Sequence, residues 1–217
     1  MTDWDVYLVT QQSHSEGRDT CKIVRAAIDG GVDIIQLREK DTTARERYEL
    51  GLDLRDLTRE ADIRLIVNDR VDLAQAVDAD GVHLGDEDLP VAAARDLLGE
   101  DAIVGRSVSF VEDARAAENA GADYLGVGAI YDTGSKDDID DEEHAIGTER
   151  LGKICDAVDI PVVGIGGINA DNAGEVVAAG ADGVAVITAI TQSDDPAEAT
   201  RALGAAVRQG RRRLESL

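Results

Sequence analysis

Short apolar runs recur along the chain, and each is preceded or followed by a longer amphipathic segment rich in Ala, Leu, Glu and Arg. The runs contain many Val and Ile residues, which is typical of parallel strands that are covered on the outside. The longer segments have the polarity pattern of surface helices. The chain is therefore expected to consist of eight strand–helix units. The eight apolar runs lie within residues 5–10, 29–37, 64–69, 78–86, 102–108, 120–129, 161–167 and 179–188.

Four of these runs begin in the same way, with a small residue or glycine, then an Asp within two or three positions, then the apolar stretch. This pattern is typical of a helix C-cap followed by a short turn and the next strand. Eight such units in about 200 residues predict an α/β fold, the (β/α)8 or TIM barrel, with residues 1–217 as a single domain. A doubly wound open sheet is the structural alternative. The four related runs lie within residues 29–37, 78–86, 120–129 and 179–188.

The composition of the chain limits which classes of molecule the protein is expected to bind. Aromatic residues make up only 3% of the 217 residues, so the core must be built from Val, Ile, Leu and Ala. The formal net charge of −23 disfavours nonspecific binding to nucleic acid or to an anionic membrane. A carboxylate-rich surface with few lysines is expected of a halophilic protein in concentrated salt, where charge repulsion is screened. Acidity that merely aids solubility is the alternative. The lysines are Lys22, Lys40, Lys136 and Lys153.

Other features bear on location and on loops. Cys21 and Cys155 form no CxxC motif, so each is expected to be a small apolar helix residue in a reduced cytosol. No secretion signal or membrane-spanning stretch is recognisable, which predicts a cytoplasmic protein. The longest break in the pattern is residues 131–147. Its acidic half is expected to be a solvated segment, with a lid over the barrel mouth as the alternative.

Polar side chains are expected to gather at the carboxyl ends of the strands, because the chemistry of such barrels lies there. Gln36, Arg38 and Lys40 alternate along an extended segment and so point to one side. Taken singly the signals are weak. An Arg-x-Lys pair often forms surface salt bridges, and Asp69 and Asp88 could be helix N-caps. The other polar residues at these ends are Asn68, His83, Asp86, Arg106, Ser107, Ser109, Thr133, Ser135 and Lys136.

Together these residues predict two anion sites and one metal site. Arg38, Lys40 and Lys136 would hold a highly charged group. Asp69 and Asp88 would bind a hard cation, and Mg²⁺ prefers one or two carboxylates together with pyrophosphate oxygens. This pairing suggests a diphosphate leaving group activated by metal. Glycines after the seventh run let backbone amides approach a monophosphate. The amides expected there are those of Gly167, Ile187 and Thr188.

Seven stretches follow one another at the spacing of barrel strands: YLVT, QLREK, VNDR, GVHLGDEDLP, GVGAIYDTGSK, PVVGIGGI and AVITAI. In order and spacing the chain resembles the thiamine phosphate synthase family over essentially its whole length. The resemblance implies transfer of the hydroxymethylpyrimidine group from its diphosphate to the ring nitrogen of hydroxyethylthiazole phosphate. The products would be thiamine phosphate and pyrophosphate.

The resemblance also implies roles for individual residues. Gln36 and Asn68 would hydrogen-bond the pyrimidine, and Asp69 and Asp88 would carry Mg²⁺. The residues expected to bind the diphosphate are Arg38, Lys40, Ser107 and Lys136. Those expected at the thiazole are Thr133 and Ser135, with the amides of Gly167, Ile187 and Thr188 at its phosphate.

The family is understood to react dissociatively, so that pyrophosphate departs before the thiazole attacks. That suits a site with cations and metal but no obvious protein nucleophile. His83 could be a general base, but a thiazole nitrogen needs no deprotonation, so a packing or positioning role is expected. Asp86 stands where the family commonly has Gln and could compete for the metal. The other departures are Ala129 and Asp132 for usual prolines, Ser135 for a threonine and Thr188 for a serine.

Two other functions remain open at the level of sequence. An isomerase resembling a thiazole tautomerase would have no need of Arg38, Lys40, Asp69 and Asp88 together. A silent phosphate-binding barrel could retain the glycine-rich stretch but would leave the diphosphate and metal sets unexplained. Small-molecule substrates are the expected partners, and the sequence leaves a homo-oligomer open.

Overall fold

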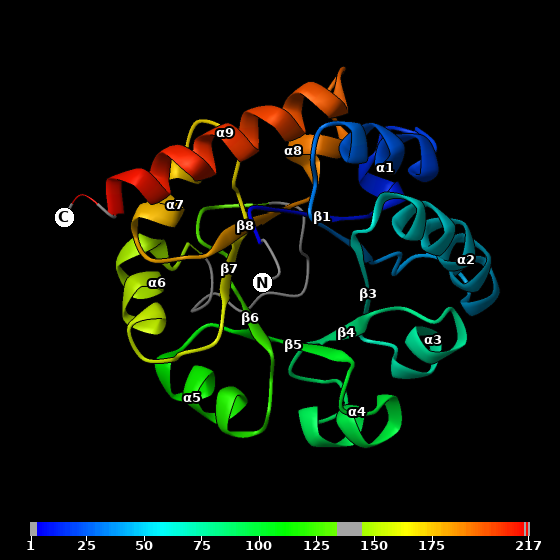
Figure 1. Cartoon of the computed structure of the whole chain (residues 1–217), viewed down its shortest axis with the longest axis horizontal. Coiled ribbons are helices and arrows are strands. Elements are labelled where there is room, and N and C mark those ends of the chain that lie inside the picture. The colour runs from blue at the N-terminus through cyan, green and yellow to red at the C-terminus, as the bar shows by residue number, and fades with distance from the viewer. Residues whose placement is uncertain (1–3, 134–144, 215, 217) are drawn as a thin grey trace.

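A computed structural model describes residues 4–133, 145–214 and 216 of the chain. Its strands are all parallel and close into a barrel in sequence order, with β8 beside β1 (Figure 1). The predicted TIM barrel is confirmed, and the open-sheet alternative is wrong. The strands are β1 (Val6–Val9), β2 (Ile34–Leu37), β3 (Arg64–Asn68), β4 (Gly81–Leu84), β5 (Ile103–Val108), β6 (Tyr124–Val127), β7 (Val162–Ile165) and β8 (Gly183–Val186).

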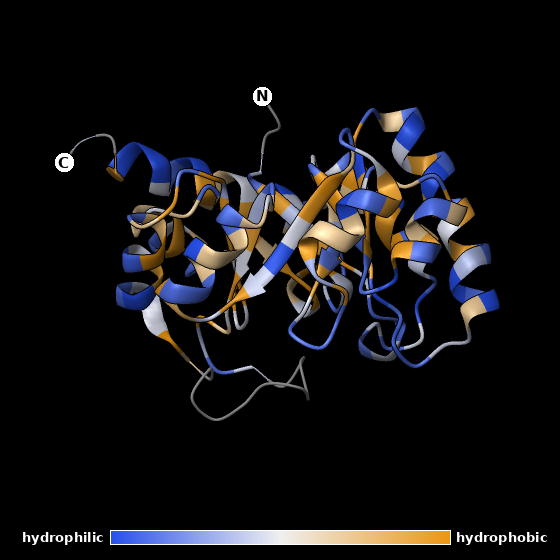
Figure 2. Cartoon of the chain, turned by 90° about the horizontal axis from the view of Figure 1, so that it is seen from below, coloured by the Kyte–Doolittle hydropathy of each residue, from blue (hydrophilic) through white to orange (hydrophobic). Residues whose placement is uncertain are grey.

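Helices surround the barrel and turn their hydrophilic residues outward (Figure 2). Cys21 and Cys155 lie in two of them, partly buried and unpaired, as expected. No helix in the described part of the chain is long and apolar enough to cross a membrane. The helical segments are η1 (Gln12–His14), α1 (Thr20–Asp29), α2 (Ala44–Ala61), α3 (Val71–Ala76), α4 (Val91–Leu98), α5 (Val111–Asn119), α6 (Gly147–Cys155), α7 (Ala173–Ala178), α8 (Thr188–Thr191) and α9 (Pro196–Leu214).

Side chains alternate between two cores along each strand, because successive residues of a strand point to opposite faces. In β1, Leu8 packs outward in the large layer between strands and helices, whereas Tyr7 and Val9 point into the barrel. The barrel interior contains several of the chain's few aromatic side chains. Trp4 stacks on Tyr124, with ring centroids 4.7 Å apart, and Tyr7 lies beside the same ring.

The Asp of each repeated motif joins one pair of neighbouring strands. Asp182 shows the arrangement: its carboxylate accepts a hydrogen bond from the Val162 amide at 2.8 Å, and its own amide donates to the Val162 carbonyl at 2.8 Å. Each Asp thus hydrogen-bonds both the backbone N–H and the backbone C=O of one residue at or next to the start of the preceding strand. The pairs are Asp33 with Val6, Asp80 with Leu65, Asp123 with Val104 and Asp182 with Val162.

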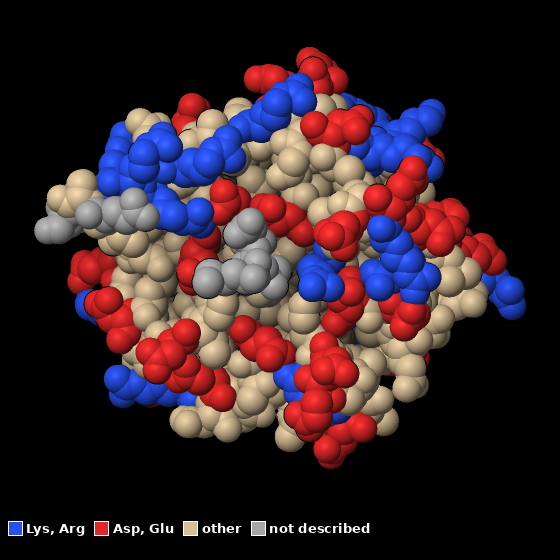
Figure 3. Space-filling view, in the orientation of Figure 1, with Lys and Arg blue, Asp and Glu red and all other residues tan. Residues whose placement is uncertain are grey.

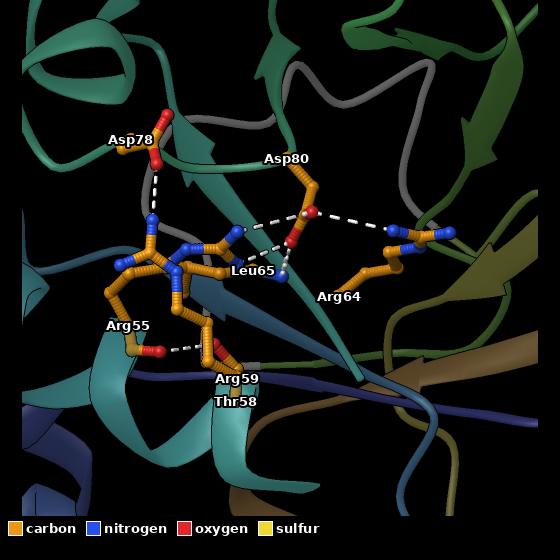
Figure 4. A network of polar contacts seen from close by, with 7 residues as sticks. All are labelled: Arg55, Thr58, Arg59, Arg64, Leu65, Asp78 and Asp80. Atoms are coloured by element: carbon orange, nitrogen blue, oxygen red, sulfur yellow. Dashed lines mark hydrogen bonds and ion pairs between the residues drawn. The ribbon is translucent and has the colours of Figure 1, made fainter. Parts of the chain in front are cut away.

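Each of these four pairings between an Asp and the backbone of one residue is called here an Asp joint. The Asp joint of Asp80 has the most additional contacts (Figure 4). Besides the Leu65 amide, its carboxylate accepts hydrogen bonds from Arg55 of α2 at 2.7 Å and from Arg64 at 3.4 Å. The nearby Arg59 donates to Asp78. Since Arg55 is largely buried, this joint also ties a covering helix to the strand ends.

Replacing Asp182 with Ala should lower the free energy of unfolding by about 1–3 kcal/mol, because the Val162 amide loses its acceptor. Urea unfolding at one fixed KCl concentration measures the change. Asp159→Ala removes an exposed carboxylate in the turn before the same strand and should have a much smaller effect. Equal losses in the two variants would contradict a structural role for the joint.

Candidate active site

A cavity opens at the carboxyl ends of the strands. It gathers predicted site residues from β2, β3, β4 and β5, which are far apart in sequence. Apolar side chains of β7 and β8 close its floor. The lining residues that carry polar side chains are Tyr7, Gln36, Arg38, Lys40, Asn68, Asp69, His83, Ser107 and Tyr124.

The predicted cation pair lies at this cavity. Arg38 is only 5% exposed, and its guanidinium donates to Gln11 Oε1 at 2.5 Å. Lys40 is more open, with Nζ 3.8 Å from Asp69 Oδ2. Both residues of the Arg-x-Lys pair line a concave site, and Lys40 also forms an exposed ion pair with Asp69. A buried guanidinium offers a fixed fork of donors to an anion.

Asp69 and Asp88 lie close enough to influence each other. Burial raises the pKa of Asp69 to about 6, with Asp88 adding to the rise and Lys40 opposing it. Asp88 is itself held in place, because its Oδ2 accepts from the Gly85 amide at 2.6 Å. Neither is a helix N-cap, since Arg70 and Pro90 occupy those positions of α3 and α4. Two adjacent carboxylates, one of which raises the pKa of the other, suit a hard divalent cation.

Asp86, the potential competitor for metal, points elsewhere. Its Oδ1 accepts from Arg106 at 2.5 Å, and its side chain is 74% exposed. Among the described residues no group of three or more metal-ligating side chains occurs. A cation held by Asp69 and Asp88 would therefore complete its coordination with ligand oxygens or water.

A second cavity adjoins the first and shares Ile165 and Ala185 with it. All three residues predicted at the monophosphate line it: Gly167, Ile187 and Thr188. Gly167 has a positive φ of 65°, and a Cβ there would come within 2.7 Å of the Asp132 carbonyl oxygen. Glycine thus lets the loop after β6 approach the end of β7.

Four predicted residues are not placed at these cavities. Asp88 lines a neighbouring pocket, together with Asp69. Ser135 and Lys136 lie outside the described residues, as does the acidic half of the 131–147 segment. Thr133 is described but is not among the residues that line either cavity. The exposed Asp132 adds to the surface acidity.

Two residues that sequence reasoning missed complete the cavity. Tyr7 and Tyr124 form a buried hydroxyl pair, 2.9 Å apart. His83 bonds both Tyr124 and Ser107, which agrees with the expected positioning role. The only sequence signal for the pair was two of the four tyrosines lying within apolar runs.

A closed (β/α)8 barrel with a buried cation, paired carboxylates and glycine-lined cavities has the architecture of a TIM-barrel enzyme acting on phosphorylated small molecules. The family model for thiamine monophosphate synthase matches residues 6–190. The chain belongs to this family, and its activity is that of a thiamine-phosphate synthase, a transferase.

Individual relatives agree. The chain is 71% identical to the thiamine-phosphate synthase of Haloarcula marismortui, over 97% of this chain and all of that one. It is 64% identical to that of Natronomonas pharaonis, over 94% and 95% of the two chains. Both are haloarchaea, in keeping with the acidic composition. Thiamine phosphate pyrophosphorylase from Pyrococcus furiosus has a similar solved structure, with a TM-score of 0.87, 43% identity and coverage of 97% and 98%.

Proposed function

We propose that the two adjoining cavities perform the synthase reaction by holding hydroxymethylpyrimidine diphosphate in the first and hydroxyethylthiazole phosphate in the second. The observation that carries this assignment is the shared wall of Ile165 and Ala185, which places the glycine-rich cavity directly beside the cationic one. Substrates in adjoining cavities can react without leaving the barrel mouth.

The pyrimidine and its diphosphate would lie across the first cavity. Gln36 and Asn68 would hydrogen-bond the ring. The buried Arg38, with Lys40 and Ser107, would bind the diphosphate, and Lys136 would join them from the loop after β6. Fixed cationic donors stabilise charge that develops on a leaving group. The departing pyrophosphate would thus be held by preorganised side chains.

Asp69 and Asp88 fit Mg²⁺, because they are hard ligands and their mutual repulsion is relieved by a cation. When bound, Mg²⁺ would neutralise charge on the leaving pyrophosphate. The chain's own groups would orient the pyrimidine and exclude water from its reacting carbon. Thr133 and Ser135 would face the thiazole, and the amides of Gly167, Ile187 and Thr188 would bind its phosphate.

The cytoplasm is the proposed cellular location, because two free cysteines suit a reducing compartment. The alternatives of a tautomerase-like isomerase and a silent binder are less favoured. Neither explains why a buried Arg38 shares a cavity with Asp69, whose carboxyl group interacts with that of Asp88.

Thiamine phosphate formation from both substrates tests the proposal directly. Product should form with Mg²⁺, disappear with EDTA and return when Mg²⁺ is restored. The rate should be highest at molar rather than low KCl, because screening relieves repulsion in a chain of net charge −23. Absence of product at every salt concentration, with the fold verified by circular dichroism, would overturn the assignment.

Asp88→Asn should raise the Mg²⁺ concentration needed for half-maximal activity by about tenfold or more, because one of two carboxylate ligands is lost. Asp86→Asn is the matched control and should change it little, since Asp86 bonds Arg106. Magnesium titrations of the initial rate compare the two. The reverse ranking would move the metal site to Asp86.

Lys136→Ala should lower kcat by about a hundredfold to a thousandfold if this lysine steadies the leaving group. Lys153→Ala removes an exposed lysine that pairs with Glu149 on α6, and it should leave kcat unchanged. Steady-state kinetics with saturating substrates distinguish them. Unchanged turnover in the Lys136 variant would contradict its assignment.

A further inference from the structure

Five side chains form one continuous hydrogen-bonded chain across the interior of the barrel, called here the polar chain. Gln36 Nε2 donates to Tyr7 Oη at 2.8 Å, and the Tyr7 and Tyr124 hydroxyls are 2.9 Å apart. Tyr124 Oη lies 2.9 Å from His83 Nδ1, and His83 Nε2 lies 2.9 Å from Ser107 Oγ. Both ends of the polar chain line the first cavity. It therefore connects two parts of one site.

The direction of the protons follows from the chemistry of each group. An amide nitrogen only donates, so the Tyr7 oxygen accepts from Gln36 and its single proton is available for Tyr124. In that direction Tyr124 would donate to His83 Nδ1, and the imidazole would carry its proton on Nε2 and donate to Ser107. The Ser107 hydroxyl would then keep its proton for a ligand, and the Gln36 carbonyl oxygen would remain an acceptor.

The opposite arrangement of the tyrosine pair is unfavourable while Gln36 donates. If Tyr124 donated to Tyr7, the Tyr7 proton would have no acceptor among the described residues, although this residue is only 1% exposed. A buried donor without an acceptor is destabilising. Burial also raises the pKa of both tyrosines, so each hydroxyl keeps the proton that the polar chain needs.

The neighbouring strands leave room for the two central rings. A Cβ on Gly105 would lie 2.2 Å from the Tyr124 ring, and a Cβ on Gly126 would lie 2.9 Å from the His83 ring. Both positions could hold a side chain only by displacing the polar chain. The barrel interior is thus shaped around these rings, and their hydrogen bonds have a fixed geometry.

Building on the proposed function, we propose that Tyr7, Tyr124 and His83 are positioning residues that set the direction of the polar chain. They make Ser107 a donor to the diphosphate and Gln36 an acceptor for the exocyclic amino group of the pyrimidine. Reversing the polar chain would reverse both ends together. Ser107 would then offer a lone pair to an anion, and Gln36 would offer N–H groups to an amine. Recognition of the two halves of the substrate is therefore coupled.

The tautomer of His83 tests the direction without any measurement of activity. The chain has three histidines, so ¹⁵N-histidine labelling gives a simple spectrum, and His83→Gln assigns the signal. At about pH 8 we expect the His83 proton to lie on Nε2. A proton on Nδ1, or on both nitrogens, would overturn the proposal even if the enzyme is an active synthase.

A double-mutant cycle tests whether the positioning residues act through Ser107. Tyr124→Phe keeps the ring but removes the donor to His83, and it should lower kcat about tenfold with KM for thiazole phosphate unchanged. In a Ser107→Ala background the same change should cost less than about twofold, because the group it orients is gone. Equal factors in the two backgrounds would contradict the proposed route.

Tyr48→Phe is the matched control, since it removes a tyrosine hydroxyl from the exposed face of α2. It should change neither kcat nor the His83 signal. Circular dichroism and thermal unfolding verify that each variant is folded. If Tyr124→Phe does not fold, the His83 tautomer of the unaltered protein still tests the proposed direction of the polar chain.

Discussion

The four Asp joints are the constraint on which the rest of the structure depends. A closed parallel barrel needs every strand to meet its neighbour in one register, and one residue at or next to the start of each of β1, β3, β5 and β7 would otherwise leave its amide without a partner. Asp33, Asp80, Asp123 and Asp182 supply the missing acceptors and use their own amides to bond the same residues. A carboxylate reaches one amide only, so each joint selects one register for its strand pair.

Register in turn decides which side chains enter the barrel. Because the side-chain period of a strand is two, a slip by one residue would turn Gln36 and Tyr7 into the helix layer and Ile35 and Leu8 into the cavity. The observed register instead sets Gly105 of β5 opposite Tyr124 of β6, which lets the tyrosine ring pass over the neighbouring strand. The joints at the amino ends of the strands thus govern the geometry of the site at their carboxyl ends.

The parts of this structure that depend on local pattern could be predicted from the sequence, and the parts that depend on register could not. Continuous Val and Ile runs between amphipathic segments were sufficient for the barrel, and the alternation in residues 36–40 placed Gln36, Arg38 and Lys40 together. The N-cap reading of Asp69 was wrong because the residue adopts a positive φ of 62° and faces Asp88 rather than an amide of α3. Tyr124 looked like an ordinary strand residue, because nothing local reveals that it lies opposite Gly105.

The acidity of the chain and its anionic substrates are compatible because they act over different distances. Figure 3 shows carboxylates spread over the face that Figure 1 also presents and a basic band along α9. In molar salt the Debye length is about 3 Å, so repulsion from such a surface does not extend to an approaching substrate. The Arg38 guanidinium in the first cavity is buried and bonds Gln11 at 2.5 Å, so burial protects its contacts from screening. An acidic surface can therefore surround a cationic site without weakening it.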